Sequence, residues 1–145
     1  AGVSEAVGMA ARLHSIYNTG SAEFKEGTVW YQVYADYAVG KGLMFEGQFD
    51  SYSRAVTRAE FARLFAAAFP DSALKAVNSV ADGAIPDVPA DAAYYAAVYK
   101  LYRAGVLTGS DAEGTFLPDT GITRGEAAAL MTRMADTSLR RSIAL

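Results

Sequence analysis

Three stretches of the chain repeat one pattern of hydrophobic and polar positions. Each begins at a glutamate, Glu5, Glu60 or Glu126, and has apolar residues one, four, five and eight positions further on. The apolar residues are Ala6, Met9, Ala10 and Leu13, then Phe61, Leu64, Phe65 and Ala68, then Ala127, Leu130, Met131 and Met134. This spacing puts the apolar side chains on one face of an α-helix. The pattern therefore predicts three amphipathic helices in the same register.

The second and third stretches also carry a helix-start signal. Thr57 stands three residues before Glu60, and Thr123 stands three residues before Glu126. In such a capping box the threonine hydroxyl accepts from a free backbone N–H, while the glutamate reaches back to the N–H of the threonine. We therefore expect these four residues to be structural caps. In the first stretch the threonine position holds Gly2.

A second repeated unit precedes each of the two capped helices. Residues 30–44 match residues 93–107 at a constant offset. One helical face is expected in each unit, formed by Tyr31, Tyr34, Ala35 and Ala38 and by Tyr94, Ala97, Val98 and Leu101. Gly42 and Gly105 stand where a left-handed residue would end each helix. Each repeat is thus predicted to be a helix, a glycine-stopped turn, a polar loop and a capped helix.

These repeats predict one all-α domain that spans the chain. Residues 1–20 are expected to be the C-terminal part of a first repeat, and residues 21–70 a second repeat. Residues 71–84 are expected to be a linker and residues 85–140 a third repeat. The alanine-rich composition supports helices, because alanine has the highest helix propensity.

Composition excludes several classes of protein. The 145 residues are 52% hydrophobic and 20% charged, which argues against disorder, and no apolar stretch is long enough to insert into a membrane. The formal charge of −3 with scattered Lys and Arg argues against nucleic acid as a partner. The absence of cysteine removes disulfides, thiolate metal sites and cysteine nucleophiles, but does not locate the protein.

The sequence gives little support to catalysis. His14 is the only histidine and has no partner residue in a recognisable motif. Glu60 and Glu126 could suggest a glycosidase pair, but their place in capping boxes accounts for both. Residues 111–114 lack the ligand spacing of a calcium loop. We therefore expect no enzyme activity, no cofactor and no bound metal.

Two arginines stand at positions suited to an anion. Arg58 and Arg124 lie in the first turn of their predicted helices, beside backbone amides that the helix end leaves free. The planar guanidinium fork matches a carboxylate. Aromatic side chains offer flat surfaces that can pack on sugar rings, as the wall of a binding groove would. The candidate wall residues are Trp30, Tyr31, Tyr34 and Tyr95.

The last repeat resembles an S-layer homology motif. Residues 85–88 resemble its opening, residues 105–109 its helix end, residues 114–119 its loop and residues 122–128 its signature. Residues 30–69 resemble a second, less complete motif, and residues 1–16 resemble only the last helix of a preceding one. The last copy departs from the family in having Ala93 in place of tryptophan and Gly125 in place of alanine, and Val3 replaces the signature arginine in the first copy.

The resemblance implies a fold and a function. Signature helices would form a central three-helix bundle with pseudo-threefold symmetry, from which the other helices project as prongs, here with the first prong missing. Grooves between prongs would bind a secondary cell-wall polysaccharide, which is acidic and commonly bears a pyruvate ketal. The site residues implied in addition to the arginines and aromatics are Asp87, Gly109, Gly114 and Thr115.

Such a module would anchor a secreted protein at a bacterial cell surface, in a cell wall or S-layer. The alternative is that the repeats are degenerate and serve as a structural packing module between proteins, with self-association in a surface layer.

Overall fold

All regular structure in the chain is helical. The computed structural model describes residues 1–145, with five α-helices, two short 3₁₀-helices and no strand. The α-helices are α1 (Val3–Thr19), α2 (Gln32–Gly40), α3 (Arg58–Ala68), α4 (Tyr95–Arg103) and α5 (Arg124–Ala135). The 3₁₀-helices are η1 (Asp71–Ala73) and η2 (Thr137–Leu139). The expected all-α class is confirmed.

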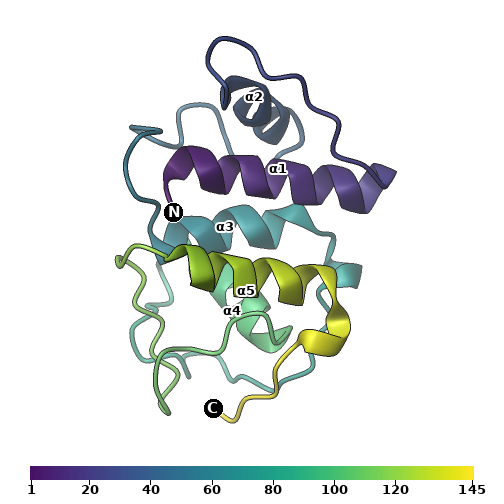
Figure 1. Ribbon diagram of the computed structural model, residues 1–145. Coiled ribbons are helices and arrows are strands. Elements are labelled where there is room, and N and C mark those ends of the chain that lie inside the picture. Colours follow the sequence, from purple (N-terminus) through teal and green to yellow (C-terminus); the bar gives the residue numbers. More distant parts are fainter.

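The three helices predicted from the glutamate pattern lie side by side and run in the same direction (Figure 1). Their starts are joined by a closed ring of backbone hydrogen bonds between equivalent residues. The N–H of Val56 donates to the carbonyl of Ala1 at 3.0 Å, and the N–H of Ile122 donates to that of Val56 at 3.3 Å. The amine of Ala1 donates to the carbonyl of Ile122 at 2.7 Å. The ring holds the three helix starts at one level. The pseudo-threefold symmetry of the whole repeats remains a prediction.

The other two helices pack on the outside of this group. Helix α2 packs against α1, and α4 packs against α3 (Figure 1). The two predicted stop residues, Gly42 and Gly105, have φ angles of 77° and 78°, in the left-handed region that favours glycine. The helix, turn, loop and capped helix of each repeat therefore follow the predicted order.

The core lies between the helices and extends under the third-repeat loop. Its largest fully buried side chains include Phe61, Phe65, Tyr99, Tyr102 and Phe116. The rings of Phe61 and Phe65 stack with centroids 4.0 Å apart. The hydroxyl of Tyr99 accepts from the N–H of Ile85 at 2.9 Å, and that of Tyr102 donates to the carbonyl of Gly114 at 2.9 Å. These two tyrosines lie outside the expected stripe, because α4 is covered by both α3 and its own loop.

The C-terminal segment folds back over the third repeat. The N–H of Arg141 donates to the carbonyl of Gly105 at 2.9 Å, and the N–H of Ile143 donates to Asn78 Oδ1 at 3.0 Å. No helix combines the length and the hydropathy needed to cross a bilayer.

Candidate functional site

A polar groove opens between α5 and the loop that follows α4. Its volume is about 280 Å³. We call it the third-repeat groove; its lining residues are Arg58, Leu107, Thr108, Gly109, Ser110, Glu126, Ala129, Leu130 and Arg133. Helix α3, the loop after α4 and helix α5 therefore all contribute to this groove, and two arginines line it.

Arg58 forms part of the base of this groove. Its Nε donates to the carbonyl of Phe116 at 2.7 Å, and its Nη1 donates to Glu126 Oε2. The guanidinium lies 5.3 Å from the centre of the Phe116 ring, and only 9% of the side chain is exposed. Nη2 has no partner in the chain. Arg58 thus joins α3, the loop and α5, and both N–H donors of its Nη2 stay available.

Arg133 lies two turns along α5 from Glu126. Its Nη1 donates to the carbonyl of Val106 at 3.1 Å, and no carboxylate lies within ion-pair distance. Partial burial lowers the pKa of Arg133 from its ordinary value, and the nearby charge of Arg141 lowers it further. The guanidinium is therefore held in place without a counter-charge.

The loop beside the groove is shaped by short contacts. The N–H groups of Phe116 and Leu117 donate to the Asp87 carboxylate at 2.8 and 2.7 Å. Thr115 donates to the Asp111 carboxylate through Oγ1 at 2.6 Å, and this hydrogen bond lowers the pKa of Asp111. Both acidic residues are thus engaged with the backbone or side chains of the loop.

Two glycines allow close contacts at this loop, one within the loop and one with the C-terminal segment. A Cβ atom on Gly109 would lie 2.7 Å from the backbone of Gly114, and one on Gly114 would lie 2.6 Å from the side chain of Leu145. Of the loop residues expected at the site, Gly109 lines the groove, whereas Gly114 is buried and, like Thr115, does not line it.

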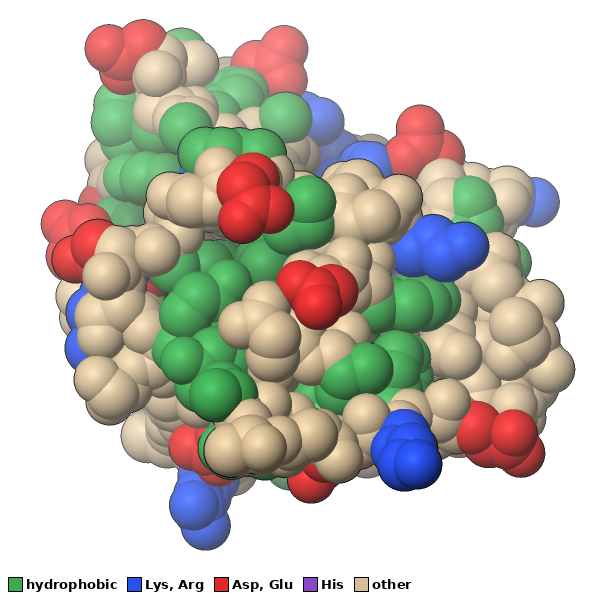
Figure 2. Space-filling view, turned by 90° about the horizontal axis from the view of Figure 1, so that it is seen from above, with side chains coloured by type: hydrophobic (Ala, Val, Ile, Leu, Met, Phe, Trp, Pro, Cys, Tyr) green, Lys and Arg blue, Asp and Glu red, His purple; other side chains and the backbone are tan.

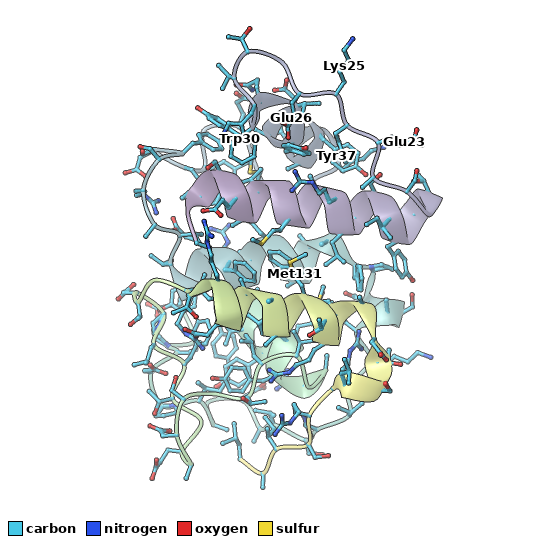
Figure 3. All side chains as sticks on the ribbon, in the orientation of Figure 1. Glu23, Lys25, Glu26, Trp30, Tyr37 and Met131 are labelled. Atoms are coloured by element: carbon cyan, nitrogen blue, oxygen red, sulfur yellow. The ribbon has the colours of Figure 1, made fainter.

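The candidate aromatics of the second repeat lie elsewhere. Trp30 is 40% exposed and lies across α1 from α5 (Figure 3). Its ring lies edge-on to the rings of Tyr31 and Tyr34, with centroids 5.9 and 6.2 Å apart. Tyr31 in turn stacks on Tyr52, with ring centroids 4.7 Å apart. Trp30 and Tyr31 are thus on a surface that does not include the third-repeat groove.

Tyr34 and Tyr95 are engaged in packing. Tyr34 is buried, and its hydroxyl accepts from Arg12 at 2.9 Å and donates to Glu26 at 2.7 Å. The Tyr95 hydroxyl accepts from a backbone N–H at 3.2 Å, and its ring lies against Tyr99 at 4.2 Å. Neither lines the third-repeat groove.

Arg124 also lies outside the groove. Its side chain is 83% exposed and approaches Glu5 at 3.5 Å. The structure therefore separates the two arginines that the sequence pairs: Arg58 is buried at the base of a groove, and Arg124 extends into solvent.

Both predicted capping boxes are present. Thr57 Oγ1 accepts from the N–H of Glu60 at 3.1 Å, and Thr123 Oγ1 accepts from that of Glu126 at 3.1 Å. The glutamates return the hydrogen bond to the threonine N–H at 3.0 and 3.4 Å. Glu126 thus caps α5 and pairs with Arg58 at the same time.

Sequence reasoning missed two arginines near these sites. Arg54 donates to both carboxylate oxygens of Glu60, at 2.9 and 2.7 Å, and this lowers the pKa of Glu60. The other is Arg133, which lies in no motif of the sequence. Its position seven residues after the signature Glu126 was the available signal, because two helical turns bring it back to the same side of α5.

The second repeat has a corresponding groove with a volume of about 450 Å³. We call it the second-repeat groove; its lining residues are Gly42, Leu43, Met44, Phe45, Gln48, Arg63 and Ala67. It has a more apolar lining than the third-repeat groove and a single arginine.

The chain was compared with known proteins. A family model described as "S-layer homology domain" matches residues 84–128, about a third of the chain. No curated protein and no solved structure shows significant similarity to the chain. The matched residues contain α4, the groove loop and the start of α5. The match places this segment in the S-layer homology domain family, whose members are non-catalytic binding modules that anchor bacterial proteins at the cell wall.

Proposed function

We propose that the chain anchors a secreted protein to the bacterial cell wall, by binding an acidic secondary cell-wall polysaccharide in the third-repeat groove. The observation that carries the proposal is the pair of arginines in one polar groove. Arg58 offers a free Nη2, and Arg133 has no carboxylate partner. Charge-assisted hydrogen bonds from guanidinium groups favour a carboxylate ligand.

The rest of the lining suits a sugar. The hydroxyls of Thr108 and Ser110 can exchange hydrogen bonds with sugar hydroxyls, and Gly109 leaves space for a ring to approach the backbone. A pyruvate ketal would supply the carboxylate directly on the ring. The groove therefore supports a saccharide with a carboxylate substituent as its ligand.

The experiment is a pull-down with purified cell walls. Binding is expected to walls that retain the polysaccharide and to fall strongly once it is extracted. Walls treated with mild acid, which hydrolyses ketals, should bind less than untreated walls. Undiminished binding after extraction would contradict the proposal, and unchanged binding after acid treatment would exclude pyruvate as the recognised group.

A second candidate function is protein packing in a surface layer. Four large apolar side chains at one end of the helix group are about half exposed: Ile16, Tyr17, Val77 and Leu139. Exposed hydrophobic side chains also gather over the segment that precedes α2, where Val29 and Trp30 are exposed, and Figure 2 looks onto this face. Apolar surface of this kind is typical of contacts between proteins.

The two functions give different results in solution. A packing module should self-associate at micromolar concentration in sedimentation velocity, with Tyr17→Ser reducing the association. A glycan anchor should remain monomeric and retain wall binding in the same variant.

A further inference from the structure

One side of α5 is exposed where the equivalent sides of α1 and α3 are covered. Helix α2 packs on α1 and α4 packs on α3, whereas no helix lies in front of α5 in Figure 1. Ala128 and Thr132, two and six residues after the glutamate of α5, are both exposed. The residues at these two positions of α1 and α3 are all buried, and they are Val7, Ala11, Ala62 and Ala66. Helix α5 thus presents a face that has no partner within the chain.

We call this surface the outer face of α5; its residues are all exposed, and they are Arg124, Gly125, Ala128, Thr132, Ala135 and Asp136. At about 100° per residue they lie within roughly a third of the helix circumference. The middle of the outer face has only small side chains, which let another helix approach closely. Its two ends have opposite charges, with Arg124 at the start of α5 and Asp136 at its end.

Neither of these two charges is fully used within the chain. The Arg124 side chain is 83% exposed and approaches a single carboxylate, that of Glu5, at 3.5 Å. Asp136 Oδ1 accepts from the N–H and the hydroxyl of Ser138, while Oδ2 has no hydrogen-bond partner. A cation at the start of a helix and an anion at its end are also disfavoured by the helix dipole. Each charge would therefore gain from a partner of opposite sign.

The outer face is complementary to itself in the antiparallel orientation. A two-fold axis at the level of Leu130 sets Arg124 opposite Asp136 of a second copy, and Asp136 opposite Arg124 of that copy. The same axis sets Ala128 opposite Thr132 of the second copy, so small side chains meet along the centre of the contact. Such a contact is isologous and closes as a dimer. The charges at its ends favour the antiparallel orientation, because a parallel pair would place like charges together.

We propose that the outer face of α5 docks a second copy of this chain, through an antiparallel two-fold contact between the two α5 helices. The inference goes beyond the proposed function, since no residue of the outer face lines the third-repeat groove. Helix α5 has 12 residues and is about 18 Å long, so the contact is smaller than the interface of a stable dimer. The chain is therefore expected to be monomeric at micromolar concentration and to pair where anchored copies are crowded on a wall.

The experiment is disulfide trapping, which is clean here because the chain has no cysteine. Ala128→Cys and Thr132→Cys, each with a different affinity tag, are mixed in a glutathione buffer at about 1 mM protein, where a weak contact is populated. The mixed disulfide is expected to exceed either homodimer several-fold, because the proposed register sets these two positions opposite one another. Ala112→Cys, at an exposed alanine of the loop after α4, is the matched control. Mixed with Thr132→Cys, it should give only the small yield of random collision.

Charge reversal tests the register. Arg124→Asp, added to both cysteine variants, should lower the mixed disulfide to the level of the control, because it sets like charges opposite one another at both ends. Arg124→Asp combined with Asp136→Arg exchanges the charges and should restore the yield. A mixed disulfide no more abundant than the control, homodimers in equal yield, or no recovery in the combined variant would each overturn the inference.

The reactivity of Ala128→Cys toward a soluble maleimide identifies any other occupant. Protection that grows with protein concentration in solution is expected for pairing between copies. Protection that appears only when wall material is added would assign the outer face of α5 to a wall component and overturn the inference. Because the trapping is done without wall material, its failure would leave the proposed function standing, and loss of wall binding would leave the pairing standing.

Discussion

Arg58 of α3 donates to Glu126 of α5, which joins two helices of the repeated pattern across 68 positions of sequence. Glu126 is the capping residue of α5 and the counter-charge of Arg58 on α3. A single ion pair thus connects helix initiation, the packing of consecutive repeats and the base of the third-repeat groove.

This relationship predicts that Arg58→Ala destabilises the fold. The substitution leaves the Phe116 carbonyl unpaired and removes a buried partner of Glu126, so a loss of about 2–3 kcal/mol is expected. Arg124→Ala is the control, because its side chain is mostly in solvent, and should change stability by less than about 0.5 kcal/mol. Urea unfolding followed by circular dichroism measures both, and equal losses in the two variants would contradict the assignment.

A second prediction concerns the stability of the fold at acid pH, to which the ion pair between Arg54 and Glu60 contributes. Arg54 lowers the pKa of Glu60 below its ordinary value of 4.5, so the carboxylate stabilises the fold above that pH. This stabilisation is lost as the pH falls through the lowered pKa, because the carboxyl must then be protonated. Arg54→Ala should therefore be less stable than the parent at neutral pH.

The difference in unfolding free energy between Arg54→Ala and the parent should narrow toward about pH 3. Urea unfolding at both pH values provides the measurement. A difference of constant size would show that Arg54 acts through packing and not through the charge of Glu60.

A third prediction concerns alkaline pH and Tyr102. Burial raises the pKa of Tyr102 above its ordinary value of 10.0, and its hydroxyl donates to the carbonyl of Gly114. The neutral phenol therefore contributes stability below that pH, and the contribution is lost as the pH rises, because the unfolded chain ionises first. Tyr102→Phe should cost about 1 kcal/mol at neutral pH.

The stability difference between the parent and Tyr102→Phe should shrink as the pH rises above 10.0. The parent loses stability there, whereas phenylalanine cannot ionise. Tyr102→Phe and the parent can be compared by urea unfolding at neutral and alkaline pH. A pH-independent difference would mean that Tyr102 ionises equally in both states.

The features that could be predicted from the sequence are those formed by residues close together in the chain. The capping boxes of Thr57 and Thr123 and the left-handed Gly42 and Gly105 depend on residues within one turn, so their patterns indicate them directly. These features set the order and the ends of the helices.

Contacts between distant segments could not be predicted in this way. Tyr34 was assigned to a groove wall, but the packing of α2 on α1 buries it and brings Arg12 to its hydroxyl. The role of Arg133 also depends on tertiary structure, because the carbonyl that orients it, on Val106, belongs to the loop after α4. Helical periodicity places a residue on a face, and only the packing of the other elements decides what covers that face.

The last prediction separates backbone strain from close contact at Gly109. Gly109→Ala forces a residue with a Cβ into a φ of 84° and also places that Cβ 2.7 Å from the backbone of Gly114. Gly47 is the matched control, because its φ is 77° and nothing lies within 4 Å of a Cβ there. Gly47→Ala should cost about 1 kcal/mol for the left-handed conformation alone.

Gly109→Ala should cost about 2–4 kcal/mol, since the loop must also move away from Gly114. Thermal unfolding of both variants measures the difference. Because Gly109 lines the third-repeat groove, Gly109→Ala should also weaken wall binding, whereas Gly47→Ala should bind walls as the parent does. Equal stability losses in the two variants would mean that the contact with Gly114 does not constrain the loop, and the hydrogen bonds to Asp87 and Asp111 would then have to fix its shape.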